Sequence, residues 1–156
     1  MAVRRSNESD LQEVLSVINE SNRSYYKAII PSENFKEPVL TMEELGELTE
    51  RMMFYIHEEV ERVVGVAALE NRGGGMGQVH WVYVLPGWQG RGVGTALVGR
   101  IESSALGAGI NSLLVVTAKG AHWARAFYEG LGYELVRTRD TPEGGVATFE
   151  KTLGRG

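Results

Sequence analysis

The 156-residue sequence contains no cysteine. This absence excludes a disulfide framework, a thiolate metal site and a cysteine nucleophile. No apolar run approaches the roughly 18 residues that a membrane-spanning helix needs. Residues 1–6 include two arginines but no apolar segment follows them, so the N-terminus does not resemble a signal peptide. We therefore expect a single domain over residues 1–156, located in the cytoplasm and without a membrane partner.

Clusters of basic residues are also missing. The chain has 16 Lys and Arg against 20 Asp and Glu, which gives a net charge of −4. Proteins that bind nucleic acids usually carry a basic patch, so we expect no nucleic-acid partner. A polyanionic ligand would have to be held by local donors. The acidic balance favours a cationic acceptor such as an amine.

The most informative part of the chain is residues 79–97, where a strand, a glycine-rich loop and a helix follow one another. The apolar run Val79–Leu85 has strand composition and is ended by Pro86 and Gly87. The glycines of Gln89–Gly94 remove side chains from the start of the next helix, where unpaired N–H groups point outward. This arrangement predicts a phosphate or pyrophosphate site. No lysine follows as a Walker loop requires, and the spacing does not fit the dinucleotide fingerprint.

This stretch resembles the coenzyme A pyrophosphate loop of the GNAT superfamily of N-acetyltransferases. The family loop reads Gln/Arg-x-x-Gly-x-Gly/Ala, matched by Gln89, Gly92 and Gly94, and it follows a strand ending in apolar-x-Pro, matched by residues 84–86. The resemblance implies that acetyl-CoA is the cosubstrate. Arg91 would either add a cation to the loop or be a solvated surface residue. The residues expected to bind the pyrophosphate are Gln89, Gly90, Arg91, Gly92, Val93, Gly94 and Thr95.

The rest of the pattern predicts an α/β chain of the α+β type. Capping boxes beginning at Ser9 and Thr41 predict the first two helices, and residues 71–75, which include three consecutive glycines, predict a flexible hairpin loop. The continuous apolar run 113–117 is expected to be buried on both faces. The order β-α-α-β-β-β-α-β-α-β-β resembles the GNAT fold, a mixed, mostly antiparallel sheet of six to seven strands flanked by about four helices. Strands are expected at 3–5, 53–58, 62–69, 79–85, 113–117, 133–138 and 146–152, and the last two helices after residue 92 and at about 121–131.

The resemblance also implies roles in binding acetyl-CoA and in releasing its thiol. The N–H of Val82 would contact the thioester carbonyl, and main-chain groups of Val84 would pair with pantetheine amides; alternatively both are core valines. Residues 124–133 resemble the family segment Ala-x-x-Phe-Tyr-x-x-x-Gly-Phe, which places Ala124 at the cofactor. Tyr128 would donate a proton to the departing sulfur, unless it is a tyrosine at the edge of the core.

The chain departs from the family pattern at the start of the fourth helix. Many members have an asparagine there, but this chain has Ala121, whose side chain cannot form a hydrogen bond. Lys119 and His122 are candidates to compensate.

The base that accepts the proton of the amine is left open. Some family members use a glutamate at the position of Gln78, which cannot accept a proton. His80 lies two residues further, on the same face of the strand, and its usual pKa near 6.5 suits a base. Alternatively, His80 has only a structural role, and Glu70 or a water relay accepts the proton.

The acceptor pocket is expected at the end of the first helix. Tyr25 and Tyr26 open a segment that resembles the Tyr-x-x-Ile-Ile-Pro segment of many uncharacterised members. These tyrosines would line the acceptor site, or they only pack the helix end.

The sequence therefore predicts an N-acetyltransferase that moves an acetyl group from acetyl-CoA to a primary amine by direct attack in a ternary complex. No metal is expected. The alternative is a CoA-binding module or sensor without turnover, and a homodimer is left open.

Overall fold

The protein forms one seven-stranded sheet in the order β1-β2-β3-β4-β5-β7-β6. The structure is a computed structural model that describes residues 2–154, so Met1, Arg155 and Gly156 of the expected 1–156 domain lie outside the described residues. The order of elements confirms the expected fold class. The strands are β1 Val3–Arg5, β2 Met52–Glu59, β3 Arg62–Gly73, β4 Met76–Val84, β5 Ser112–Ala118, β6 Glu134–Arg139 and β7 Val146–Thr152. The helices are α1 Leu11–Tyr26, α2 Met42–Leu48, α3 Val93–Gly107 and α4 His122–Gly130, with short 3-10 turns η1 Glu8–Asp10 and η2 Ser32–Asn34.

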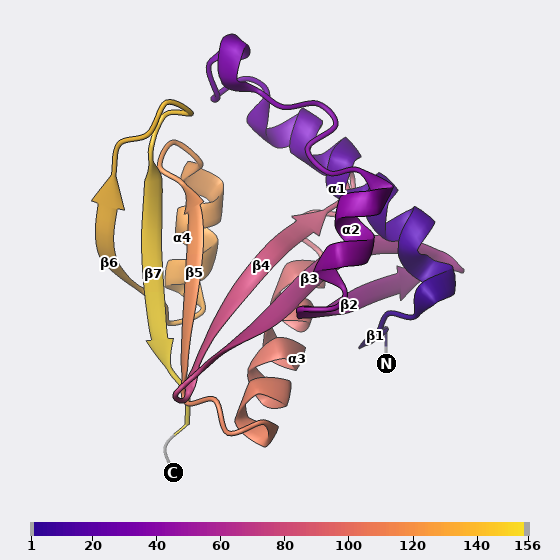
Figure 1. Ribbon diagram of the computed structural model, residues 1–156, viewed down its shortest axis with the longest axis vertical. Coiled ribbons are helices and arrows are strands. Elements are labelled where there is room, and N and C mark those ends of the chain that lie inside the picture. The colour runs from indigo at the N-terminus through magenta and orange to yellow at the C-terminus, as the bar shows by residue number, and fades with distance from the viewer. Residues whose placement is uncertain (1, 155–156) are drawn as a thin grey trace.

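Strands β4 and β5 are parallel neighbours joined by α3, whereas the other neighbouring strands pair antiparallel. Their ladder runs from Met76 opposite Ser112 to Val79 opposite Val115 and stops there, although both strands continue. The sheet consequently opens as a V between β4 and β5 (Figure 1). This opening determines where ligands can reach the main chain of β4.

A β-bulge in β4 lies at the start of the opening. Trp81 has φ of +57°, a left-handed conformation that residues with side chains rarely adopt. The register with β3 changes from Ala68 opposite His80 to Val66 opposite Tyr83, so β4 contains one extra residue. Because alternation restarts after the bulge, His80 and Tyr83 lie on the same face of the sheet.

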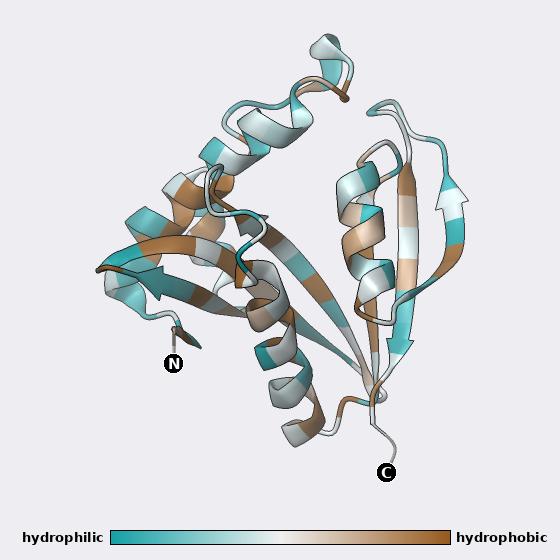
Figure 2. Cartoon of the chain, turned by 180° about the vertical axis from the view of Figure 1, so that it is seen from behind, coloured by the Kyte–Doolittle hydropathy of each residue, from teal (hydrophilic) through white to brown (hydrophobic). Residues whose placement is uncertain are grey.

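The helices cover the two faces of the sheet differently. Helices α1 and α2 lie over the β1–β4 half on one face, which we call the α1 face, and α3 and α4 lie on the opposite α3 face (Figures 1 and 2). On the α1 face, Ile18 and Leu45 are fully buried against the sheet, while Leu97 and Ile101 are fully buried on the α3 face. Burial of one such side chain contributes roughly 1.5–3 kcal/mol. No helix within residues 2–154 is long and apolar enough to cross a membrane.

The expectation that Ser9 caps the first helix is wrong. Asn7 caps the short 3-10 turn η1, whose last residue, Asp10, is the N-cap of α1. The side chain of Asn7 accepts from the N–H of Ser9 at 2.9 Å, and the carboxylate of Asp10 accepts from the N–H of Asn7 at 2.7 Å. The guanidinium of Arg4 donates two hydrogen bonds of 2.9 Å to the carboxylate of Asp10. These bonds fix the turn so that it begins at Asn7, two residues before Ser9. The second box, between Thr41 and Glu44, is confirmed.

Two further expectations about strands are corrected. Residues 113–117 are buried on one face only, because α4 lies on that face while α1 and α2 lie over the β1–β4 half of the other (Figure 1). Leu113 is fully buried, but Val116 is 42% exposed. Strand β3 extends to Gly73 and β4 begins at Met76, so the connection is a tight turn at Gly74 and Gly75.

Candidate active site

The glycine loop ends at Gly92, which caps the N-terminus of α3 with φ of +81°, and Gly90 has φ of +77°. Both are left-handed positions that favour glycine. The N–H of Ala96 bonds to the carbonyl of Gly92 at 3.0 Å. The N–H groups of residues 93–95 precede this bond, so they have no helical carbonyl to pair with. Such N–H groups at the positive end of a helix dipole are suited to binding an anion.

Gly94 has a different function from the other two glycines. It is helical, and a Cβ atom there would lie 3.1 Å from Cζ of Phe127 in α4. Glycine at this position therefore allows α3 to pack closely against α4. This packing places the glycine loop next to α4. Arg91 is exposed, and its guanidinium lies 4.7 Å from the ring centre of Trp88. Trp88 was not identified from the sequence as a neighbour of the loop cation.

A cavity of about 710 Å³ runs from this loop into the opening between β4 and β5. It is lined by residues from the loop, β4, β5, α1 and α4. Arg91 and Glu70 are not among the described lining residues. The predicted site residues that line it are Tyr25, Tyr26, His80, Val82, Val84, Gln89, Gly90, Gly92, Val93, Gly94, Thr95, Ala124 and Tyr128.

The main chain of β4 faces the opening at alternate residues. The N–H of Leu85 bonds to the carbonyl of Val64 in β3 at 2.9 Å. Since main-chain groups alternate in direction along an antiparallel strand, those of Val84 and Val82 turn away from β3. The carbonyl of Val84 accepts from the hydroxyl of Tyr25 at 2.9 Å, so it already has one partner. The side chains of both valines pack in the core, as the alternative interpretation expected.

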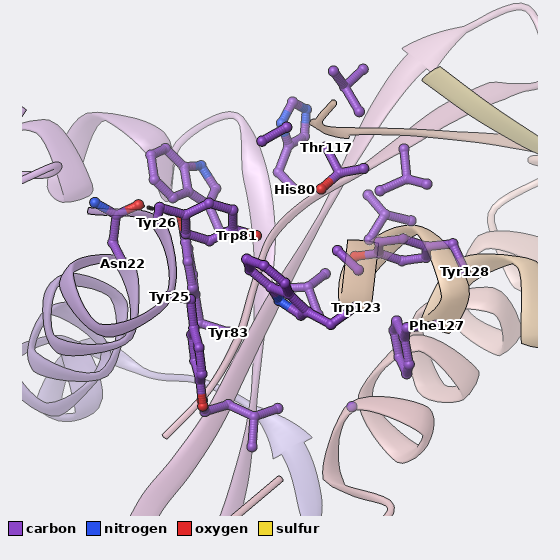
Figure 3. A pocket seen from close by; sticks show the side chains of 18 of the residues that line it. Asn22, Tyr25, Tyr26, His80, Trp81, Tyr83, Thr117, Trp123, Phe127 and Tyr128 are labelled. Atoms are coloured by element: carbon purple, nitrogen blue, oxygen red, sulfur yellow. Dashed lines mark hydrogen bonds between the residues drawn. The ribbon is translucent and has the colours of Figure 1, made fainter. Parts of the chain in front are cut away.

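Tyr128 lies at the wall of the cavity on α4 (Figure 3). Its ring packs edge to face against Phe127 and Tyr133, with centroids 5.0 and 5.8 Å away. Burial raises the pKa of the Tyr128 hydroxyl far above its usual value. The hydroxyl therefore stays protonated at neutral pH and can donate a hydrogen bond.

His80 and Glu70, which the sequence offered as alternative bases, form a pair. Nε2 of His80 lies 2.7 Å from Oε1 of Glu70, and Oε2 of Glu70 lies 3.7 Å from a guanidinium nitrogen of Arg51. An ionised carboxylate only accepts, so Nε2 carries the hydrogen and Nδ1 keeps its lone pair. Burial lowers the pKa of His80, and the bond to Glu70 opposes this in part. The imidazole is therefore neutral at pH 7 and able to accept a proton.

The neighbouring polar residues are engaged elsewhere. The amide oxygen of Gln78 accepts from Arg72 at 2.6 Å. Ala121 is fully buried at the start of α4, and the ammonium of Lys119 bonds to Asp140 at 3.0 Å. Neither Lys119 nor His122 belongs to the cavity lining among the described residues.

Aromatic rings line the cavity on the side of α1 (Figure 3). Tyr26 contacts Tyr83 and Trp123, with ring centroids 6.1 and 5.6 Å apart. Tyr25 also contacts Trp123, at 6.3 Å, and Trp81 contacts Tyr83 at 6.4 Å. Sequence reasoning identified only the two α1 tyrosines. The three missed rings belong to the bulged strand and to an exposed position of α4.

Comparison with protein families matches residues 15–133 to the acetyltransferase (GNAT) family. The match covers more than half of the chain, so the protein belongs to this family and is an acyltransferase. None of the curated proteins matches the chain in sequence at a significant level.

Solved structures with the same fold include several N-acetyltransferases. The ribosomal-protein-alanine N-acetyltransferase of Brucella melitensis has a TM-score of 0.80 and 18% identity, over 98% of this chain and 100% of that chain. PaiA N-acetyltransferase of Thermoplasma acidophilum, in complex with coenzyme A, has a TM-score of 0.82 and 18% identity, over 97% and 98%. The ribosomal-protein-S18-alanine N-acetyltransferase of Escherichia coli has a TM-score of 0.78 and 15% identity, over 99% and 94%. These similarities show the fold.

Proposed function

We propose that the whole chain works as one acetyl-CoA-dependent N-acetyltransferase, which transfers acetyl to a primary amine by direct attack in a ternary complex. One observation carries the proposal. The anion site of α3 and the hydroxyl of Tyr128 belong to the α3 face, while His80 and Glu70 belong to the α1 face. The two groups meet where β4 and β5 separate. Two ligands can therefore enter from opposite faces and react in the opening.

The binding of acetyl-CoA follows from the main chain. The N–H groups at residues 93–95 would hold the pyrophosphate, and the CoA-bound neighbour from Thermoplasma acidophilum supports this ligand class. The N–H of Val82, turned toward the opening, would bond to the thioester oxygen. A fixed donor at a developing oxyanion is worth about 3 kcal/mol in comparable sites.

The attacking amine must first lose a proton, because its usual pKa is near 10.4. Nδ1 of His80 would accept this proton, and the carboxylate of Glu70 would stabilise the resulting imidazolium across 2.7 Å. The neutral nitrogen then attacks the thioester carbon, and the C–S bond of the tetrahedral intermediate breaks. The second proton that the nitrogen loses passes through water to the departing thiolate, which leaves as the free thiol. No covalent enzyme intermediate is needed, since the chain has no cysteine.

The departing thiolate would be stabilised by Tyr128. Burial raises the pKa of this tyrosine above the value of about 8.5 for a thiol, so full proton transfer to sulfur is uphill. A hydrogen bond from the hydroxyl to the developing negative charge is therefore the larger contribution.

The experiment that tests this function measures free thiol released from acetyl-CoA with a panel of primary amines, alongside calorimetric titration with CoA. Amine-dependent thiol release supports the proposal. Tight CoA binding with no thiol release from any amine would instead support a CoA-binding module without turnover.

A further inference from the structure

We infer that the acceptor is a small monoamine whose primary amine is attached to a flat aromatic body. This inference rests on the proposed function and names the substrate class for the same site. It is based on an aromatic chamber, which we define as the rings of Tyr25, Tyr26, Trp81, Tyr83 and Trp123.

The chamber is a continuous series of ring contacts across three elements. It runs from Trp81 to Tyr83 in β4, then to Tyr26 in α1, and on to Trp123 in α4, with centroids 5.6 to 6.4 Å apart. The interplanar angles lie between 39° and 87°, so the rings are tilted or edge-to-face and not stacked in parallel. Offset and edge-to-face contacts are the arrangements that a further aromatic ring prefers.

The chamber lies on the path to the base. The bulge at Trp81 places Tyr83 on the same face as His80, and Trp81 and Tyr83 both pack on the α1 side of the sheet. A molecule that presents its amine to His80 from that face must therefore contact these rings. An ammonium group over such a ring is also attracted before it loses its proton.

Two of the three tyrosine hydroxyls of the chamber are already used by the protein. Tyr25 donates to the carbonyl of Val84 at 2.9 Å, and Tyr83 donates to Asn22 at 3.2 Å. Burial raises the pKa values of Tyr25, Tyr26 and Tyr83, so the rings stay neutral. The chamber therefore presents mainly ring surface to a ligand.

The scarcity of acidic residues in the cavity lining argues against a polyamine as the acceptor. Glu143, exposed in the β6–β7 connection, is the only acidic residue among the described residues that line the cavity, and Arg139 lines it too. Glu70 lies behind His80 and is bonded to it. One carboxylate–imidazole pair suits one amine, whereas a second ammonium would find only the exposed Glu143 as an anionic partner, on a lining that also carries Arg139.

The surroundings also favour a small molecule over a polypeptide. The amide nitrogen of Asn34, in η2, donates to the carbonyl of Pro142 at 2.7 Å, which joins the α1–α2 segment to the β6–β7 connection. A peptide would pair with main-chain groups of β4, but the carbonyl of Val84 is already bonded to Tyr25.

The test is calorimetric titration of the CoA-loaded protein with four amines. These are 2-phenylethylamine, n-hexylamine as the matched amine without a ring, spermidine, and a short peptide with an N-terminal alanine. We expect 2-phenylethylamine to bind about tenfold more tightly than n-hexylamine, from its additional ring contacts, and the other two to bind more weakly still. Equal binding of n-hexylamine, or tighter binding of spermidine or the peptide, would overturn the inference.

A pair of variants keeps the test specific. Trp123→Leu removes a chamber ring that is 40% exposed, so the fold should survive, and we expect the preference to fall to about threefold or less. Phe35→Leu removes an aromatic ring that is not among the described lining residues and should leave the preference unchanged. If 2-phenylethylamine binds more tightly than n-hexylamine but no thiol is released, the aromatic-amine ligand class stands and the proposed acetyl transfer is rejected. Thiol release without the preference would keep the transfer and reject the aromatic acceptor.

Discussion

His80 and Glu70 are joined by a bond of 2.7 Å between Nε2 and Oε1, although they lie on different strands and ten residues apart. The bond fixes the tautomer of the imidazole and places a negative charge beside it. A histidine held in this way can act as a base because the proton that it accepts is stabilised on the far side of the ring.

The pH dependence of turnover tests this pair. Burial holds the pKa of His80 below its usual value of about 6.5, so the midpoint of the acid limb of turnover should lie below pH 6.5. Glu70 raises the pKa of His80, and Glu70→Gln removes the charge but keeps an acceptor. We therefore expect the acid limb of kcat to move to lower pH and the plateau to fall roughly tenfold. Glu50→Gln, at an exposed residue near the end of α2, is the control. An acid limb that Glu70→Gln does not move would contradict His80 as the base.

Removal of the hydroxyl of Tyr128 tests the leaving-group role. In Tyr128→Phe the ring contacts with Phe127 and Tyr133 remain, so the melting temperature should change little. We expect kcat to fall by about 100-fold, the lower end of general acid–base contributions. Tyr133→Phe is the matched control, because its hydroxyl bonds to Glu102 at 2.9 Å, away from the cavity lining. It should cost about 1 kcal/mol of stability and leave kcat unchanged. Full kcat in Tyr128→Phe would remove Tyr128 from the mechanism.

Alanine substitutions along the glycine loop separate backbone conformation from packing. Gly92→Ala faces open space but has φ of +81°, so the loop must rearrange, at a cost of about 1–2 kcal/mol, and CoA affinity should fall roughly tenfold. Gly94→Ala meets Phe127 at 3.1 Å and should lower the melting temperature as well.

Gly99→Ala is the control for both glycine variants. Gly99 lies within α3, has open space around it and does not have positive φ. Alanine there should stabilise the protein by roughly 0.5–1 kcal/mol and leave CoA affinity unchanged. Calorimetric Kd values that do not change in Gly92→Ala would contradict the anion site.

The glycine loop was predictable because its chemistry is local. The glycines, the preceding Pro86 and the following helix are neighbours in sequence, and together they define an N-terminal anion site without any knowledge of distant contacts. The order of strands followed from the same kind of pattern. The capping box before α1 did not, because Arg4 in β1 holds Asp10, and Asp10 accepts from the N–H of Asn7, so the box begins at Asn7 in η1 and not at Ser9.

The residues that we propose to surround the acceptor were less accessible from sequence. The pairing of His80 with Glu70 depends on the register between β3 and β4. The tight turn at Gly74 sets this register, whereas the longer loop expected from the sequence would have left the register undefined. The positive φ of Trp81 is a tertiary feature that interrupts the period of two, so alternation alone could not place Trp81 or Tyr83 correctly.

The most direct test of the central claim is initial-rate kinetics with acetyl-CoA and the amine varied together. Direct attack in a ternary complex requires both ligands to be bound before thiol is released, so we expect intersecting double-reciprocal lines and no thiol release without amine. Parallel lines with a burst of thiol before the amine is added would show a covalent acetyl-enzyme. That result would contradict the mechanism, and no thiol release with any amine would contradict the proposed function.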